Sequence, residues 1–97
     1  MTKGYWIGHV TVEDAAQYEA YRAANGAVFA EYGARFLVRG GTQEVVEGAL
    51  RPRCVVIEFD SFEAARACYF SQGYQDAKAL RINAGISDLA IVDGYAG

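Results

Sequence analysis

The order of its strand-like and helix-like segments constrains this 97-residue chain more than any other feature of the sequence. Runs rich in aromatic and β-branched residues, typical of strands, occupy 4–12, 34–47, 53–59 and 88–95. Apolar residues at spacings of three and four, typical of helices, occupy 15–32 and 61–84, with an interruption at 71–73. The order is therefore βαββαβ, and a chain of this length is expected to be a single domain, 1–97.

This order predicts a ferredoxin-like α+β fold. Right-handed crossovers place both helices on one face of a four-stranded antiparallel sheet of order 4-1-3-2. From the same crossovers we also expect the first and third strands to lie side by side and parallel. Asp14 with Gln17, and Asp60 with Glu63, predict the two helix starts. The glycine pair at 40–41 predicts a bulge or bend within the second strand.

Alternation along the strands divides the side chains between two faces of the sheet. The face expected to pack on the helices carries Trp6, Val10, Val12, Phe36, Val38, Val55, Ile57, Phe59, Ala90 and Val92. The open face still carries Tyr5, Ile7, Leu37, Val56, Leu89 and Ile91. Solvent-washed faces rarely hold so many large apolar groups, and the hydrophobic fraction of 53% exceeds the usual ~45–50%. We therefore expect a homodimer whose sheets face each other in a dimeric α/β barrel.

Four polar residues predicted on the open face form the candidate catalytic cluster. Across the expected strand order they are Asp93, His9, Glu58 and Arg39. His9, the only histidine, is the expected general acid/base. We expect Arg39 to contact Glu58 and anchor a carboxylate or enolate, while Glu58 or Asp93 orients the histidine. The structural alternatives are an Arg–Glu pair that neutralises itself and a histidine hydrogen-bonded within the core.

A second group of candidates lies on the helices. The candidate substrate-binding residues are Tyr18, Asn25, Ser71, Tyr74 and Arg81. Asn25 stands out because a buried amide needs hydrogen-bond partners. For the tyrosines the alternative is ordinary packing with the hydroxyl at the rim. A pocket would lie either inside the barrel or between the first helix and the sheet.

Composition argues against several classes of function. The net charge is −3 and the basic residues are scattered, so nucleic acid is not an expected partner. No apolar run approaches the ~20 residues that cross a bilayer, and Lys3 is followed by a strand-like run instead of a signal peptide. Cys54 and Cys68 lack a second Cys/His pair, and a single histidine supplies few ligands for a metal or haem. We expect a cytoplasmic protein with reduced thiols, no membrane contact, no metal and no cofactor.

Several blocks of the sequence are similar to a known family. GYWIGHV, RFLVRGG, VVIEF and IVDGY, within a likeness that runs from Gly4 to Gly97, resemble the domain-of-unknown-function 1330 (DUF1330) family of small bacterial proteins. The resemblance implies the dimeric α/β-barrel superfamily. Other families there include cofactor-independent monooxygenases, muconolactone isomerases and haem-dependent dismutases or peroxidases. The family has no assigned reaction, so the resemblance carries over no catalytic residue, and the likeness to the other families of the superfamily is only one of fold.

Three functions are compatible with these features. The leading hypothesis is an enzyme for a small anionic or carbonyl-bearing molecule, using acid/base, isomerase-type or cofactor-free oxygenase chemistry in the barrel. The alternatives are a non-catalytic small-molecule binding or regulatory module and a purely structural dimer. The sequence does not decide whether the protein is an enzyme.

Overall fold

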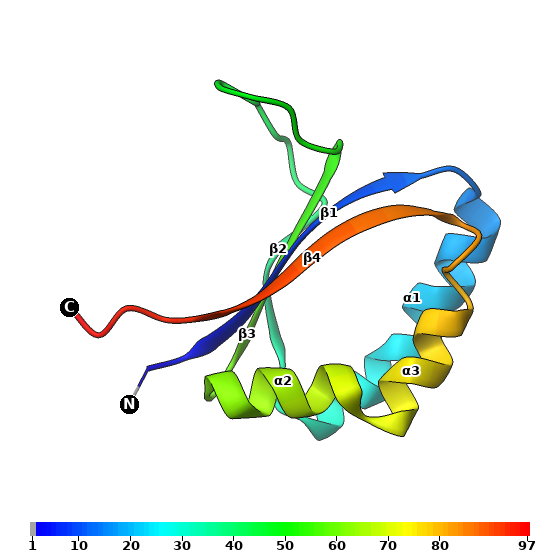
Figure 1. The fold of residues 1–97 in the computed structure, drawn as a ribbon. Helices are drawn as coiled ribbons and strands as arrows, with labels where there is room; N and C mark the ends of the chain where they lie inside the picture. Colours follow the sequence, from blue (N-terminus) through cyan, green and yellow to red (C-terminus); the bar gives the residue numbers. More distant parts are fainter. Residues whose placement is uncertain (1) are drawn as a thin grey trace.

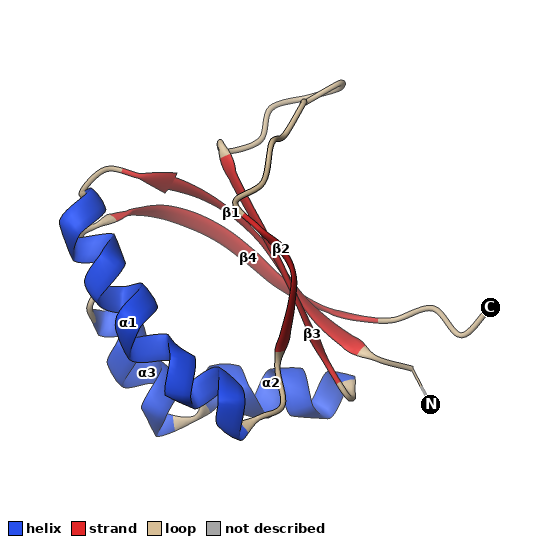
Figure 2. Cartoon of the chain, turned by 180° about the vertical axis from the view of Figure 1, so that it is seen from behind, coloured by secondary structure: helices blue, strands red, loops and turns tan. Residues whose placement is uncertain are grey.

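All three helices lie on one face of a curved sheet, and the other face is open (Figures 1 and 2). The structure, a computed structural model, describes residues 2–97. Its elements are β1 (Gly4–Val12), α1 (Ala15–Glu31), β2 (Arg35–Arg39), β3 (Arg53–Phe59), α2 (Phe62–Phe70), α3 (Gln72–Ala79) and β4 (Gly85–Asp93). The predicted order is confirmed, with the second helical region split into α2 and α3. None of the helices described within residues 2–97 is long and apolar enough to cross a membrane.

The four strands form one sheet in the order β2-β3-β1-β4, which is the predicted order. Each pair of neighbours is antiparallel, including β1 with β3. The prediction that the first and third strands are parallel is therefore wrong. Each crossover skips one strand position, so the strands that run in the same direction are the non-adjacent pairs, β1 with β2 and β3 with β4.

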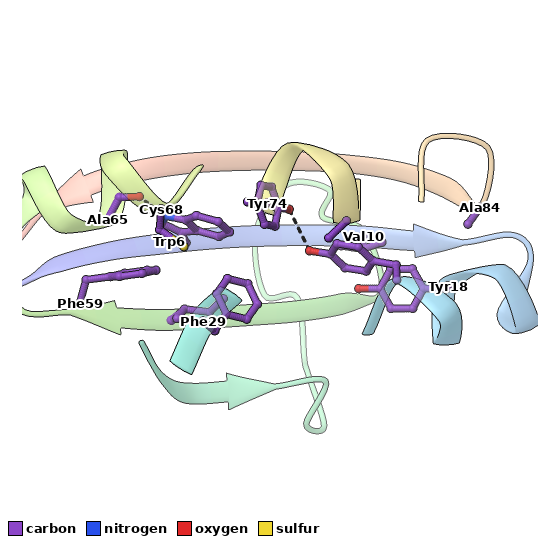
Figure 3. Packing of buried hydrophobic residues seen from close by; sticks show 12 residues of the cluster. Trp6, Val10, Tyr18, Phe29, Phe59, Ala65, Cys68, Tyr74 and Ala84 are labelled. Atoms are coloured by element: carbon purple, nitrogen blue, oxygen red, sulfur yellow. Dashed lines mark hydrogen bonds between the residues drawn. The ribbon is translucent and has the colours of Figure 1, made fainter. Parts of the chain in front are cut away.

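The core fills the space between the sheet and the helices and is built around Trp6 of β1 (Figure 3). The Trp6 ring packs, at centroid distances of 4.8–5.7 Å, against the rings of Phe29, Phe59, Tyr69 and Tyr74. Its Nε1 donates to a backbone carbonyl oxygen of α2 at 2.8 Å. Each fully buried large apolar side chain contributes about 1.5–3 kcal/mol to stability. These contacts join β1, β3 and all three helices.

One extra residue in β2 reverses the predicted faces at the end of that strand. The register pairs Phe36 with Ile57 and then Val38 with Val56, so Leu37 has no partner and forms a β-bulge. The residues after the bulge change faces, and Val38 lies on the open side. The bulge precedes the glycine pair that was expected to bend the strand. Residues 41–46 have no regular structure, so the predicted continuation of the strand to 47 is wrong, and 40–52 project beyond the sheet as a loop (Figure 1).

The phase predicted for β4 is also wrong. Leu89 and Ile91 pack against the core, and Ile91 lies opposite Trp6. Ala90 and Val92 are exposed on the open face. The strand has apolar residues at consecutive positions 89–92, so alternation alone did not determine which pair faced inward.

The predicted N-cap is confirmed for α1 and is wrong for α2. Asp14 Oδ1 accepts a hydrogen bond from the Gln17 amide at 3.0 Å, which confirms the start of α1. The N-cap of α2 is Ser61, whose Oγ accepts from a first-turn amide at 3.0 Å. Asp60 is therefore not the cap that we predicted; it accepts instead from Arg35 at 3.2 Å.

Candidate functional site

A cavity lies between the helices and the sheet, on the side away from the open face. Its aromatic lining consists of Trp6, Tyr18, Tyr21, Phe29, Phe36 and Tyr74. The space open to the centre of a water molecule is about 60 Å³. Because one water needs roughly 10–15 Å³ on that measure, the cavity has room for roughly four to six waters, or for an organic molecule of about one ring.

The cavity is cationic although the whole chain carries a net charge of −3. Four arginines line it, namely Arg22, Arg39, Arg53 and Arg81. Arg22 forms an ion pair within α1 at 3.0 Å. The other three have no carboxylate within 4.0 Å anywhere in residues 2–97. The only carboxylate in the lining, Asp88, is exposed and held at 2.9 Å by an arginine outside the cavity. An anion in this cavity would therefore meet uncompensated positive charge.

Two tyrosine hydroxyls and a guanidinium meet in this lining. Tyr21 and Tyr74 are joined by a hydrogen bond of 2.8 Å between their hydroxyls, in which either oxygen can donate (the dashed line at Tyr74 in Figure 3). Arg81 Nη2 donates to the Tyr74 hydroxyl oxygen at 3.3 Å, and its guanidinium carbon lies 5.4 Å from the Tyr21 ring centroid. Burial raises the pKa of the Tyr74 hydroxyl far above its ordinary value, and the Tyr21 hydroxyl adds to this shift. Tyr74 is therefore a protonated hydrogen-bond donor at neutral pH and not a base.

Three buried polar atoms of the lining have no hydrogen-bond partner in the described part of the chain. They are Arg22 Nε, Asn25 Oδ1 and Arg53 Nε. Asn25 is 3% exposed and is the only buried residue of polar or charged type among residues 2–97. Leaving such an atom unpaired costs about 1–3 kcal/mol. Because Asn25 lines the cavity, a ligand that donates a hydrogen bond to Oδ1 would remove this cost.

The structure does not assemble the predicted cluster of four catalytic residues. The β2 bulge turns Arg39 to the helix side, where its guanidinium carbon lies 4.2 Å from the Phe36 ring centroid and lines the cavity. The predicted contact between Arg39 and Glu58 is therefore wrong. Asp93 does not lie beside His9, because it pairs with Gly4 at the far end of β1 and accepts from the Thr2 hydroxyl at 2.6 Å.

His9 and Glu58 do lie on the open face, but in separate surroundings. Across the sheet, His9 is directly opposite Cys54 on one side and Asp88 on the other. Glu58 is opposite Tyr5, four residues along β1 from His9, which is about 13 Å at the usual rise of a strand. The distance is too great for one intramolecular site.

Glu58 has the contacts of a structural carboxylate. It accepts from Arg35 Nε at 3.0 Å and from the Tyr5 hydroxyl at 3.2 Å. The hydrogen bond from Arg35, followed in effect by that from Tyr5, lowers the pKa of Glu58 even though partial desolvation opposes the shift. The partner of Glu58 is therefore Arg35, which precedes the bulge, and not Arg39, which follows it.

Four of the five predicted substrate-binding residues line the cavity: Tyr18, Asn25, Tyr74 and Arg81. Ser71 does not. Its Oγ donates to the Cys68 carbonyl oxygen at 2.7 Å and accepts from the Tyr74 amide at 3.1 Å, so it joins α2 to α3. The sequence left two locations open for a pocket, inside the barrel or between the first helix and the sheet, and this cavity lies at the second.

Other residues that line the cavity were not predicted from the sequence. They are chiefly Tyr21, Arg22, Arg53 and Asp88. A signal for two of them was present, because Tyr18, Tyr21, Arg22 and Asn25 follow the 3-4-7 spacing of one helix face. Polar groups on an otherwise buried helix face are a sign of a lined cavity. No comparable signal marked the β3 and β4 residues, since their faces depended on the strand register.

Comparison with known proteins identifies the fold of the chain that forms this cavity. No curated protein matches the sequence significantly. The RPA0582 protein of Rhodopseudomonas palustris, of unknown function, superposes with a TM-score of 0.76 at 18% identity, over 99% of this chain and 85% of that one. SnoaB, a cofactor-independent oxygenase from Streptomyces nogalater, gives 0.63 at 16% identity over 100% and 97%. A dimeric ferredoxin-like protein of Thermobifida fusca gives 0.63 at 15% identity over 95% and 91%.

These likenesses show the fold, which is ferredoxin-like. The sequence itself matches the family described as "Domain of unknown function (DUF1330)" over residues 3–95. Because that match spans every strand and helix of the structure, the chain belongs to the DUF1330 family.

Proposed function

We propose that this protein is an enzyme that binds a small organic anion in the cavity between helices and sheet and transforms it without a cofactor. The observation that carries the proposal is the concentration of unpaired arginines there, in a chain whose net charge is −3. Arg53 and Arg81 are partly buried and Arg39 is exposed, and an anion in the cavity would supply the negative charge that these three guanidinium groups lack. The aromatic walls suit the carbon skeleton of such an anion.

The chemistry that fits these groups is removal of a proton next to a carbonyl. Arg39 and Arg53 would hold a carboxylate of the substrate, while the donors at Tyr74 and Arg81 would stabilise the negative oxygen of the enolate. Solvent would take the proton. Return of the proton to another carbon completes an isomerisation. Reaction of the carbanion with O2, followed by protonation and loss of water, completes an oxygenation. The similarity to the cofactor-independent oxygenase SnoaB supports the second outcome at the level of fold.

The experiment is a screen of small carboxylates, 1,3-dicarbonyl compounds and phenols by thermal shift, followed by NMR of each hit in D2O. Exchange of a substrate C–H proton that requires the protein would support the enzyme, and oxygen uptake would identify oxygenation. Arg53→Gln should weaken binding at least about tenfold, as expected for loss of a charge-assisted contact. Arg66→Gln is the matched control, because Arg66 lies on the exposed side of α2, stacked on Phe70. The same loss of affinity in both variants would contradict the proposal.

A non-catalytic binding module is the second candidate. Two observations favour it: the lining contains no histidine, and the pKa of its buried tyrosine hydroxyl is shifted away from neutrality. This reading predicts tight binding of an anion with no proton exchange and no product. His9→Ala separates a third possibility, since loss of turnover in that variant would place the chemistry on the open face and not in the cavity.

The proposal includes a homodimer formed through the open face. The open face of residues 2–97 presents the apolar side chains of Tyr5, Ile7, Val38, Val56, Ile86, Ala90 and Val92. The dimeric ferredoxin-like neighbour from Thermobifida fusca supports this arrangement. Ile7→Glu should shift the protein to monomers in sedimentation velocity. Ile82→Glu, an exposed position on the turn before β4, should leave the mass unchanged.

Two free thiols and no disulfide among the described residues fit a cytoplasmic location, which is also part of the proposal.

A further inference from the structure

We infer that the cluster of Tyr21, Tyr74 and Arg81 is an oxyanion site that selects a conjugated or aromatic ring carrying an ionised oxygen, such as a phenolate or a cyclic enolate. This inference rests on the proposed function, because it assigns the substrate class of the same cavity. It is carried by a proton count, by the placement of the guanidinium and by the walls beside the hydroxyls.

The proton count shows that the cluster keeps one donor free. The two hydroxyls have two protons, and their mutual hydrogen bond of 2.8 Å uses one of them. Arg81 donates to the Tyr74 oxygen and so consumes neither. No other acceptor for these hydroxyls occurs among the hydrogen bonds of residues 2–97. Whichever tyrosine donates to the other, one phenolic proton is left to point at a third group.

Arg81 gives this free proton a positive neighbour. Its guanidinium is fixed by hydrogen bonds to the Tyr74 hydroxyl at 3.3 Å and the Ser87 hydroxyl at 3.4 Å. Its other three N–H groups have no hydrogen-bond acceptor among residues 2–97. The neighbours that fix it are neutral, so its charge is not cancelled. A protonated phenol and a cation that converge on one point favour a single ionised oxygen over a neutral carbonyl.

The walls beside the hydroxyls favour a ring as the rest of the ligand. The Tyr74 ring centroid lies 4.8 Å from that of Trp6 and 6.0 Å from that of Phe29, and Phe29 is 5.5 Å from Phe36. All four residues line the cavity. A planar π-system can pack against these rings edge to face, which aliphatic acids do poorly. The free volume, about 60 Å³ for a water centre, also suits one ring.

The test uses p-nitrophenol, whose ionised form is seen directly by its visible absorbance. If the cluster binds the oxyanion, the apparent pKa of the dye bound to wild-type protein falls below that of the free dye. Tyr74→Phe and Tyr21→Phe each remove one of the two protons and should weaken binding of the phenolate about ten- to a hundredfold. Tyr69→Phe is the matched control, because its hydroxyl accepts from Lys78 at 3.0 Å and is not part of the lining.

A second probe separates the inference from the function on which it rests. Benzoate, held by Arg39 and Arg53, should bind to wild type and keep its affinity within about threefold in Tyr74→Phe. Benzoate binding with no change in the dye's ionisation would overturn the oxyanion site but leave the anion cavity intact. Binding of neither probe would overturn both. The wild-type titration decides even if a tyrosine variant fails to fold, since it needs no substitution.

Discussion

Replacing Asn25 by leucine should make the ligand-free protein more stable while it abolishes ligand binding. Asn25 lies on the buried face of α1, 3% exposed, and its Oδ1 has no partner within residues 2–97. In most buried positions the loss of an amide breaks a hydrogen bond and destabilises the protein. Here no bond to that oxygen is lost, so the sign of the effect should be reversed.

The magnitude follows from two contributions. Removing an unpaired buried polar atom recovers about 1–3 kcal/mol. Leucine also has a better helix propensity than asparagine by a few tenths of a kcal/mol. The free energy of unfolding should therefore rise by at least about 1 kcal/mol, which raises the Tm of a domain of this size by about 4–8 °C. Asn25→Ala tests the same reasoning without added bulk, should leucine overfill the site.

The assay is urea denaturation followed by circular dichroism, with Gln17→Leu as the matched control. Gln17 is also an amide of α1, but its Nε2 donates to the Leu80 carbonyl oxygen at 2.7 Å. Its loss should lower the free energy of unfolding by about 0.5–1.5 kcal/mol. Opposite signs for the two amides support an amide reserved for a ligand. Destabilisation by both Asn25 variants would refute the reasoning, because it would show that the amide has a structural partner.

Three further predictions concern stability and reactivity. Gly85→Ala should lower the free energy of unfolding by about 1–3 kcal/mol in urea denaturation, because the added Cβ would collide with the Thr11 carbonyl oxygen. Gly26→Ala has open space around the added Cβ and should raise the free energy of unfolding by about 0.5–1 kcal/mol. Equal effects of the two substitutions would contradict this reasoning. Contact with Arg35 lowers the pKa of Glu58 in the folded protein, so the stability that this carboxylate contributes is present above the pKa of Glu58 in the unfolded chain and is lost as the pH falls toward the folded value. Glu58→Gln should therefore make the free energy of unfolding depend less on pH on the acid side, measured by denaturation curves at several pH values. An unchanged pH dependence would argue against this role of Glu58. Burial raises the pKa of the Cys68 thiol to about 12, so iodoacetamide should modify it only after unfolding, and labelling in the native protein, read by mass spectrometry, would refute its burial.

Most of the fold could be predicted because the relevant signals are local. The carboxylate cap of α1, the spacing of apolar groups in α1 and the aromatic run of β1 are each visible within one element, and crossover handedness then leaves few topologies. The parallel pairing of the central strands was an error of reasoning about topology, because the same crossovers require antiparallel neighbours. The extent of β2 was wrong because the residues at 44–47 have strand propensity but no neighbouring strand within reach.

The candidate site could be predicted only where it depends on helix spacing. Tyr18, Asn25, Tyr74 and Arg81 lie on helices or just after them, where a side chain's direction follows from a period of 3.6 residues. The catalytic cluster depended on strand register, which is set by pairing and is not visible in a single strand. One unpaired residue in β2 was enough to move Arg39 from the open face to the cavity.

That displacement has a chemical consequence for the whole molecule. With Arg39 on the helix side, the described residues divide into two faces of different charge character. The open face holds its arginines in pairs, Arg35 with Glu58 and Arg51 with Asp88, as a surface that is to be covered by a second copy would require. The helix face collects the unpaired ones. A bulge next to a site commonly redirects one side chain, and here the redirected side chain is a cation added to a cavity that already holds others. Leu37, the bulge residue that made the prediction for Arg39 wrong, therefore supports this cavity as the place where an anion binds.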